Sequence, residues 1–181
     1  MRVSQSGLHL VPVTDRLDLV AEPVALALRD WAHANEVRVA EIDPELADTA
    51  AFCAAYGVGL DVSANCVIVA GKRDGQLRYA ACLVLATTRA DVNGVVRRHL
   101  DVRKASFAPM DTAVAETGMR YGGITPIGLP AGWPILVDTA VADTAEVVIG
   151  SGLRDSKLAL PGKALLELPG AELVEGLGGP S

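Results

Sequence analysis

The sequence predicts an α+β fold: a single domain with a mixed, mostly antiparallel, barrel-like sheet flanked by helices. Two observations predict it. The apolar segments occur as hairpins and short crossings, without the regular alternation of strand and helix that is typical of a doubly wound parallel sheet. The length of 181 residues, of which 50% are hydrophobic, suits one domain with a substantial core.

The N-terminal part predicts a helix, a strand and a second helix after a lead-in over residues 1–20. Over residues 22–34, apolar residues recur at helical spacing behind a proline suited to a first helical turn. Residues 36–43, EVRVAEID, alternate polar and apolar residues, which is typical of a strand. A helix over residues 44–56 follows, and Gly57 ends it.

The central part predicts a β-hairpin followed by two helices. Apolar strands over residues 64–71 and 76–86 enclose the sequence KRDG, in which Gly75 can adopt the positive φ of a tight turn. A helix over residues 91–100 begins at an aspartate suited to capping it. A short helix over residues 110–118 ends at a glycine.

The C-terminal part predicts short apolar strands over residues 134–138, 145–150 and 156–161. A short helix over residues 162–168 and the segment AELVEGL follow. The chain ends in a tail over residues 176–181 that we expect to be disordered.

The domain is therefore expected to span residues 21–175, between the lead-in and the tail. Mean hydropathy is high, +0.32. A membrane span needs about 20 consecutive apolar residues, and the one long uncharged run is broken by prolines. No secretory signal is evident, so a cytoplasmic protein without membrane contact is expected. The net charge of −6 argues against nucleic-acid binding by overall charge.

The cysteines and histidines predict neither a disulfide framework nor a metal site. Cys53, Cys66 and Cys82 lack CxxC spacing, and each lies in an apolar context where a thiol behaves as a small buried hydrophobe. The three histidines are scattered without paired ligand spacing. We expect no metal and no other cofactor.

One basic cluster departs from the acidic balance of the chain. Arg97, Arg98, Arg103 and Lys104 lie together in the sequence VVRRHLDVRKASF. Such a cluster is commonly a solvated helix face, and the alternative is a patch that contacts phosphate. The sequence leaves both interpretations open.

The segment YGGITPIGLPAGWPILVD, residues 121–138, is long, almost uncharged and rich in glycine and proline. Gly122 and Gly123 lack Cβ, so a ligand can approach the main chain closely and successive amides can form a concave donor site. Pro126 fixes its own φ and biases Thr125 toward extended geometry, which orders the loop in advance. The segment matches neither a P-loop nor a dinucleotide fingerprint. It predicts a pocket-forming loop or, alternatively, a rigid surface loop over the core.

A second glycine turn, IGSGLRDSK, follows a predicted strand. Gly150, Ser151 and Gly152 could offer amides and a hydroxyl to a ligand. Ser151 has no neighbouring base in the sequence to activate it as a nucleophile, so a binding role is favoured. Asp138, at the end of an earlier strand, could orient an amine or cap the next turn.

The order of these segments resembles the YbaK/prolyl-tRNA-synthetase-associated domain family over roughly residues 20–175. The most specific shared element is a Gly-x-x-x-Pro loop, matched by Gly122 to Pro126 within ETGMRYGGITPIG. The strand that ends at Asp138 and the turn over residues 150–152 agree with the family in order and spacing.

The resemblance implies a trans-acting deacylase that removes a small mischarged amino acid, of the Ala, Cys, Ser or Pro class, from tRNA without a metal. The loop would present main-chain groups to the aminoacyl moiety, and the terminal ribose hydroxyl of the substrate would assist attack by water. The expected partners are the aminoacyl-tRNA 3′ end and an aminoacyl-tRNA synthetase. The residues implied as catalytic are Gly122, Pro126 and Asn65; as substrate-binding, Gly123, Thr125, Asp138, Gly150, Ser151 and Gly152; and as tRNA-binding, Arg97, Arg98, Arg103 and Lys104.

One position departs from the family pattern. The family has a lysine where its first long strand begins, and here Asn65 takes that place, or Ala64 if the alignment shifts by one. Loss of that cation weakens a charge-assisted contact with the nucleotide end. Lys72 and Arg73 lie at the far end of the strand, about 23 Å away. The departure motivates an alternative function, a non-catalytic module that binds an amino acid or an aminoacyl group.

Overall fold

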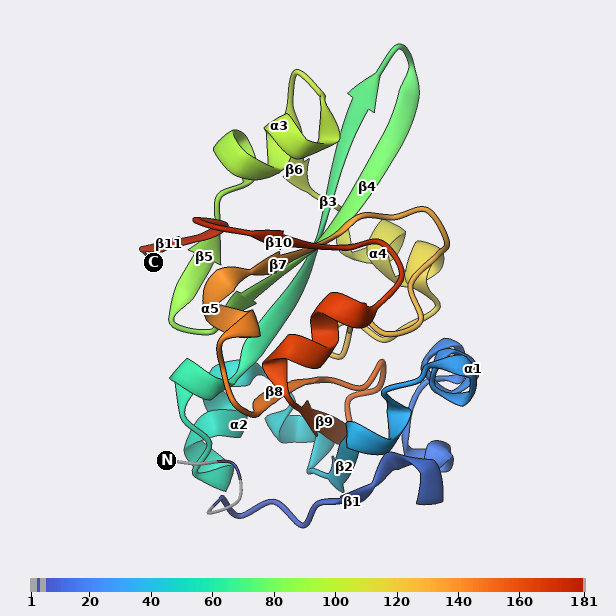
Figure 1. Cartoon of the computed structure of the whole chain (residues 1–181), viewed down its shortest axis with the longest axis vertical. Helices are drawn as coiled ribbons and strands as arrows, with labels where there is room; N and C mark the ends of the chain where they lie inside the picture. Colours follow the sequence, from blue (N-terminus) through green and yellow to red (C-terminus); the bar gives the residue numbers. More distant parts are fainter. Residues whose placement is uncertain (1–2, 4–5, 181) are drawn as a thin grey trace.

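The computed structural model describes residue 3 and residues 6–180, and the statements below concern these residues. They form the predicted α+β domain, with helices around mostly antiparallel sheets (Figure 1). The long hairpin of β3 (Ala64–Arg73) and β4 (Gln76–Leu85) runs through the molecule and projects at one end. Asp74 and Gly75 turn the chain between the two strands, both with positive φ, which confirms the predicted hairpin.

The hairpin forms the middle of a five-stranded sheet with the order β10-β7-β4-β3-β6. Strand β6 (Ala105–Phe107) pairs antiparallel with β3 over three residues. On the other side, β7 (Ile135–Asp138) lies parallel to β4, and β10 (Ala171–Val174) lies parallel to β7. The sheet is therefore mixed, as predicted.

A second, four-stranded sheet has the order β1-β2-β9-β8 and is antiparallel throughout. Its strands are β1 (Val11–Pro12), β2 (Arg38–Glu41), β8 (Val147–Gly150) and β9 (Ser156–Leu160). All five residues of β9 are buried, because this strand lies between β2 and β8. The strands predicted over residues 36–43, 145–150 and 156–161 are thus present with shortened ends.

The sheets are not closed into a barrel, which corrects the expectation of a barrel-like sheet. A third sheet, β5 (Thr88–Ala90) with β11 (Gly178–Pro180), stands apart from the other two. Strand β11 also departs from the disordered tail expected at the C-terminus. Its pairing with β5 and the full burial of Leu177 hold this segment in place.

The helices lie around the sheets, and those that end at residues 56, 100 and 117 end where the sequence predicts. The first helix ends at Asp30, before the predicted residue 34, and the helix over residues 139–142 was not predicted. The helices are α1 (Glu22–Asp30), α2 (Thr49–Tyr56), α3 (Arg97–Leu100), α4 (Met110–Thr117) and α5 (Thr139–Ala142). Gly57 and Gly118 adopt the left-handed conformation directly after α2 and α4, as glycine does at helix ends.

Three predicted helices differ from the expectation in type. The helix expected from Pro44 begins as a 3-10 turn, Pro44–Leu46, and α2 follows only at Thr49. The helix expected over residues 91–100 opens with a π-helical turn, Val92–Val96, whose Gly94 and Val95 amides donate to the Asp91 carboxylate. The last predicted helix is a 3-10 helix, Gly162–Glu167.

The largest core cluster lies between the two main sheets and α1. Leu28, Leu83, Ile127 and Leu158 are among its nearly inaccessible members. Burial of each such side chain stabilises the fold by about 1.5–3 kcal/mol. Within the described ranges, no helix combines the length and the apolar character that crossing a membrane requires.

Candidate functional site

A cavity of about 260 Å³ lies along one edge of β3. Strand β4 pairs with β3 along its whole length, but on the opposite side β6 pairs only with residues 69–71. A single bridge joins Ser63 to Val148 at the other end. Between them, residues 64–67 have no strand partner on this side in the described chain, and all four line the cavity. An open strand edge presents main-chain donors and acceptors that a ligand can use.

The glycine loop and β8 form the opposite wall. Gly122, Ile124 and Gly150 line the cavity, so the structure brings the two glycine segments to Asn65. Close packing of main chain on main chain requires glycine at position 150, since a Cβ there would lie 2.6 Å from the carbonyl oxygen of Gly123. The two segments are tied together by a hydrogen bond of 2.6 Å from the Gly152 amide to the Gly123 carbonyl.

Two amides of the loop remain available. Gly123 donates to the Arg120 carbonyl and Thr125 to the sulfur of Met119, whereas the amides of Gly122 and Ile124 donate to no acceptor in the described part of the protein. Gly122 holds φ at +87°, a conformation that favours glycine. Both residues line the cavity, so the loop retains main-chain donors for a ligand.

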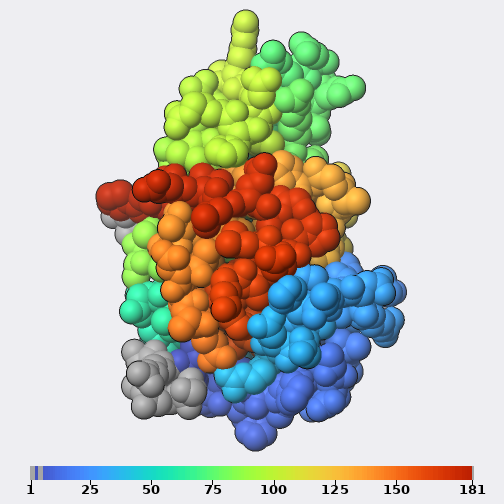
Figure 2. All heavy atoms as spheres, viewed as in Figure 1, coloured from blue at the N-terminus to red at the C-terminus, as the bar shows by residue number. Residues whose placement is uncertain are grey.

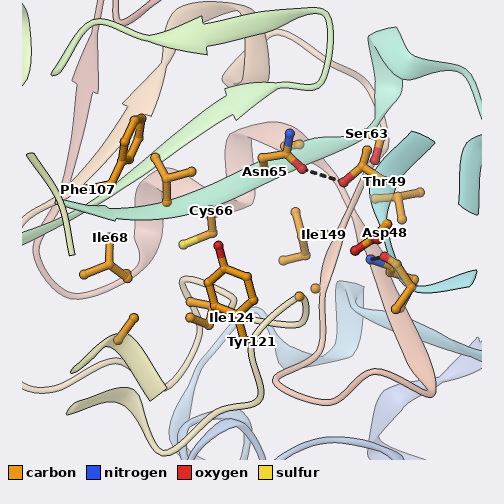
Figure 3. A pocket seen from close by; sticks show the side chains of 18 of the residues that line it. Asp48, Thr49, Ser63, Asn65, Cys66, Ile68, Phe107, Tyr121, Ile124 and Ile149 are labelled. Atoms are coloured by element: carbon orange, nitrogen blue, oxygen red, sulfur yellow. Dashed lines mark hydrogen bonds between the residues drawn. The ribbon is translucent and has the colours of Figure 1, made fainter. Parts of the chain in front are cut away.

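One end of the cavity is polar. The start of α2 contributes Asp48 and Thr49, and β3 contributes Ser63 and Asn65 (Figure 3). The Thr49 hydroxyl donates a hydrogen bond of 2.7 Å to Oδ1 of Asn65. The Asn65 side chain is therefore held by α2 and carries no charge.

The other end is apolar and has an aromatic rim. Ile68 and Phe107 lie at this end, and the phenol of Tyr121 points toward Cys66 (Figure 3). Phe107 is 54% exposed and Tyr121 is 51% exposed. Exposed aromatic faces at a cavity mouth are suited to stacking with a nucleobase.

The cysteine in the cavity is a protonated thiol. Burial raises the pKa of Cys66 far above the usual value, and the nearby Cys82 raises it further. Burial likewise raises the pKa of Cys82 to about 12. Because the thiolate is the nucleophilic form, Cys66 is a wall residue of the cavity at neutral pH. In the parts of the chain that the structure covers, His, Cys, Asp and Glu side chains form no cluster that could hold a metal ion.

The sequence analysis missed Lys157, which also lines the cavity. It lies on β9 opposite Gly150 of β8 and is only 8% exposed. Burial lowers the pKa of the Lys157 ammonium; Arg154 lowers it further, whereas Cys53 and Asp48 raise it. A lysine inside the apolar segment SKLAL was the signal in the sequence, because lysine is rarely buried without a partner.

Three predicted residues of the loop, Gly123, Thr125 and Pro126, lie outside the lining of the cavity. Thr125 is fully buried, and its hydroxyl has no hydrogen-bond partner in the described residues. Pro126 is also buried and borders a different hollow, described below. Their contribution at this site is therefore to fix the path of the loop behind Gly122 and Ile124.

Three further predicted residues have structural contacts away from the cavity. Ser151 is fully buried, and its hydroxyl shares a 2.6 Å hydrogen bond with that of Ser156. Gly152 donates to the loop, as described above. Asp138 is buried at the end of β7, next to Gly178 of β11. Burial raises the pKa of Asp138, although the nearby backbone amides of Gly178, Thr139 and Leu177 favour its charged form.

The four predicted tRNA-binding residues lie on a projection beside the cavity. We call the tip of the β3–β4 hairpin together with residues 91–104 the basic projection; it forms the upper end of the molecule (Figure 2). Arg97 donates to the Asn93 carbonyl, while Arg98, Arg103 and Lys104 are exposed. Lys104 directly precedes β6, whose last residue belongs to the aromatic rim.

The second half of the loop borders a larger hollow of about 570 Å³. Its lining is rich in proline, glycine and tryptophan, and its charged members are Asp30 and Glu172. It contains neither Asn65 nor the two available amides. The smaller cavity is therefore the candidate site.

Comparisons with known proteins agree with this fold. A family model described as the aminoacyl-tRNA editing domain matches residues 43–168, more than half of the chain. A solved structure described as a candidate trans-editing enzyme for prolyl tRNA synthetase is 20% identical with a TM-score of 0.72, and the match covers 84% of this chain and 93% of that chain. A hypothetical protein is 21% identical with a TM-score of 0.74, covering 87% and 100%. A scaffold from computational epitope grafting is 22% identical with a TM-score of 0.73, covering 86% and 95%.

Proposed function

The chain belongs to the aminoacyl-tRNA editing domain family, and we propose that it is a trans-acting deacylase for a small mischarged amino acid. The observation that carries the proposal is the cavity, which brings Asn65, the available amides of Gly122 and Ile124, and Gly150 into one small space. The editing role described for one structural neighbour supports action in trans. Such a substrate would place the protein in the cytoplasm.

In the proposed reaction, water adds to the ester carbonyl carbon and the ribose oxygen leaves. The proton lost by the water ends on the departing ribose oxygen, so the products are the free amino acid and a tRNA with its hydroxyl restored. Negative charge develops on the carbonyl oxygen in the transition state. The amides of Gly122 and Ile124 would donate to that oxygen, and each such donor contributes about 3 kcal/mol in comparable sites.

The size of the cavity supports a small aminoacyl group. Its volume of about 260 Å³ lies below the range of about 300–1,000 Å³ that is common for drug-sized ligands. Ile68, Ala113, Ile124 and Ile149 limit the space around the amino acid side chain. We therefore expect alanine, cysteine, serine or proline to be accepted and large aromatic amino acids to be excluded.

The aromatic rim and the basic projection supply a path for the tRNA. The terminal base would stack on Phe107 or Tyr121, which are exposed at the mouth. Arg98, Arg103 and Lys104 would then meet the backbone phosphates of the acceptor end.

Hydrolysis of a panel of aminoacyl-tRNAs tests the proposal. Alanyl-, cysteinyl-, seryl- and prolyl-tRNA are incubated with the protein, and phenylalanyl-tRNA serves as the control that is too large for the cavity. At least one small aminoacyl-tRNA should lose its amino acid faster than in buffer, and phenylalanyl-tRNA should not. A panel in which no member is hydrolysed faster than in buffer contradicts the deacylase.

A second candidate function is a binding module without hydrolysis. The observation that favours it is the neutral Asn65, whose Oδ1 is already engaged by Thr49. Binding of a non-hydrolysable aminoacyl-adenosine without turnover of any aminoacyl-tRNA would establish this function in place of the first.

A further inference from the structure

The cavity contains a buried cation, Lys157, to which neither candidate function assigns a role. Lys157 is the single Lys or Arg among the described residues that line it. Its Nζ donates a 3.1 Å hydrogen bond to the Ala47 carbonyl and lies 5.1 Å from the centre of the Phe52 ring. An ammonium has three donors, and the described residues supply Lys157 with this one acceptor and no ion pair.

A buried ammonium with one hydrogen-bond acceptor and no ion pair needs another partner. Removal of an ammonium from water without full hydrogen bonding or a counter-ion is costly. The contact with the Phe52 ring offsets part of that cost. The remaining donors lie at a cavity wall, where a ligand with a negatively charged oxygen would satisfy them.

From this geometry we infer that Lys157 is the anion-binding group of the cavity and contacts a negatively charged oxygen of the ligand. The inference rests on the proposed function for the identity of that ligand. An aminoacyl-tRNA end offers two such oxygens: a phosphate of the backbone, which is charged before reaction, and the ester carbonyl oxygen, which becomes charged during it.

The position of Lys157 also explains how the site can lack a cation at Asn65. Lys157 binds the Ala47 carbonyl, and Asn65 binds the Thr49 hydroxyl, so both side chains contact the same turn at the start of α2. They reach it from different sheets, Lys157 from β9 and Asn65 from β3. Lys157 therefore brings a cation to the polar end of the cavity from β9. The family pattern instead places its lysine at the start of the first long strand, which is β3 here.

A purely structural role makes different predictions. In that case Lys157 would only tie β9 to the Ala47 carbonyl, and a neutral donor would serve as well. Lys157→Gln retains an amide that can donate to this carbonyl, and Lys157→Met retains the length without a donor. Lys163→Met, at an exposed position of the C-terminal 3-10 helix, is the matched control for loss of a lysine elsewhere.

The first experiment measures hydrolysis of the accepted aminoacyl-tRNA by these variants, with thermal unfolding to verify the fold. We expect kcat/KM to fall at least tenfold in both Lys157→Gln and Lys157→Met, and to stay within twofold of wild type in Lys163→Met. Asn65→Lys added to Lys157→Met should recover at least part of the loss. A rise in KM identifies the phosphate as the contact, and a fall in kcat identifies the ester oxygen. A folded Lys157→Gln with wild-type kinetics overturns the inference.

The second experiment separates this inference from the proposed function. Affinity is measured for 3′-alanylamino-3′-deoxyadenosine, an amide that cannot be hydrolysed as an ester, with and without a 5′-phosphate. If wild type is no deacylase but binds the phosphorylated compound at least tenfold more tightly than Lys157→Gln does, the inference stands and the deacylase fails. If wild type shows no hydrolysis, equal affinity of the two proteins, or no binding by wild type, overturns the inference. If wild type hydrolyses the ester, equal affinity overturns it when kcat is also unchanged in Lys157→Gln.

Discussion

Burial disfavours the charged form of two side chains of the cavity, Cys66 and Lys157, because a low dielectric penalises charge on any group. For Cys66 the pKa rises and the thiol stays neutral. For Lys157 the pKa falls, and the nearby Asp48 and Cys53 counteract the fall. The cavity thus combines an unreactive thiol with a cation and main-chain donors, which favours attack by water over attack by a protein nucleophile.

Cys66→Ser tests this at the residue scale. The substitution should leave kcat/KM for the accepted aminoacyl-tRNA within about twofold of wild type, since the thiol is protonated and serves as a wall. Alkylation of Cys66 by iodoacetamide should likewise be slow at pH 7. It should accelerate only as the pH rises toward the elevated pKa, where the thiolate appears. Loss of hydrolysis in a folded Cys66→Ser protein, together with rapid alkylation at pH 7, would indicate a covalent mechanism.

At the scale of elements, the long segment over residues 121–138, rich in glycine and proline, borders two different cavities. Its first part, through Ile124, borders the candidate site, and its second part, from Pro126, borders the larger hollow near α1. Thr125 lies buried between them. The first part of the segment thus lines the candidate site, and the second part borders the larger hollow while burying Ile127 in the core.

A pair of glycine substitutions separates the role of the loop main chain from backbone strain. Gly122 and Gly132 both have φ of +87°, but only Gly122 lines the candidate site, and a Cβ on Gly132 would meet nothing within 4 Å. Alanine costs similar backbone strain at each position. We expect Gly122→Ala to lower kcat/KM at least tenfold and Gly132→Ala to leave it within about twofold.

Activity assays and thermal unfolding of the two variants verify this pair. Both should lose a similar, small amount of stability through the shared backbone conformation. Gly122→Ala must also shift the Arg154 side chain, because the new Cβ would overlap Nη1 of its guanidinium. An equal loss of activity in both would trace the effect to strain, and full activity in Gly122→Ala would remove the loop from the site.

Sequence patterns predicted the elements that depend on neighbouring residues, such as a hairpin turn or the end of a helix. The β3–β4 hairpin is confirmed by its turn residues, and α2 and α4 end at the predicted glycines. Strands β6 and β11 were missed because each is three residues long and becomes a strand only by pairing with a distant partner. Lys157 was missed for the same reason: its acceptor, the Ala47 carbonyl, lies 110 residues away in the sequence.

The predicted site residues are divided as well, because some of them line the cavity and others lie elsewhere. Asn65, Gly122 and Gly150 were predicted and line the cavity together. Ser151 and Asp138 carry polar groups that a ligand could use, but burial and contacts with neighbouring segments place them elsewhere. Composition identifies groups capable of binding, whereas the path of the chain decides which of them share a cavity.

At the scale of the whole molecule, charge is unevenly distributed. The chain carries a net charge of −6, yet Arg98, Arg103 and Lys104 are exposed on the basic projection, directly before the strand that ends at Phe107 of the aromatic rim. Arg73 is engaged with Asp101, whereas Arg98, Arg103 and Lys104 form no ion pair within the described ranges. A polyanion would thus be attracted to one end of an otherwise acidic protein, and that end adjoins the cavity.

The salt dependence of tRNA binding tests this distribution of charge. Each phosphate that a cation neutralises releases counter-ions, so log affinity falls with log salt concentration by about 0.7–0.9 per contact. Replacement of Arg97, Arg98, Arg103 and Lys104 by glutamine should weaken binding and flatten the slope by up to about 3. Glutamine at Arg29 and Lys163, two exposed cations of α1 and the C-terminal 3-10 helix, should leave the slope unchanged. An equal slope in wild type and the fourfold variant would mean that the projection is a solvated face and that tRNA approaches the cavity from another side.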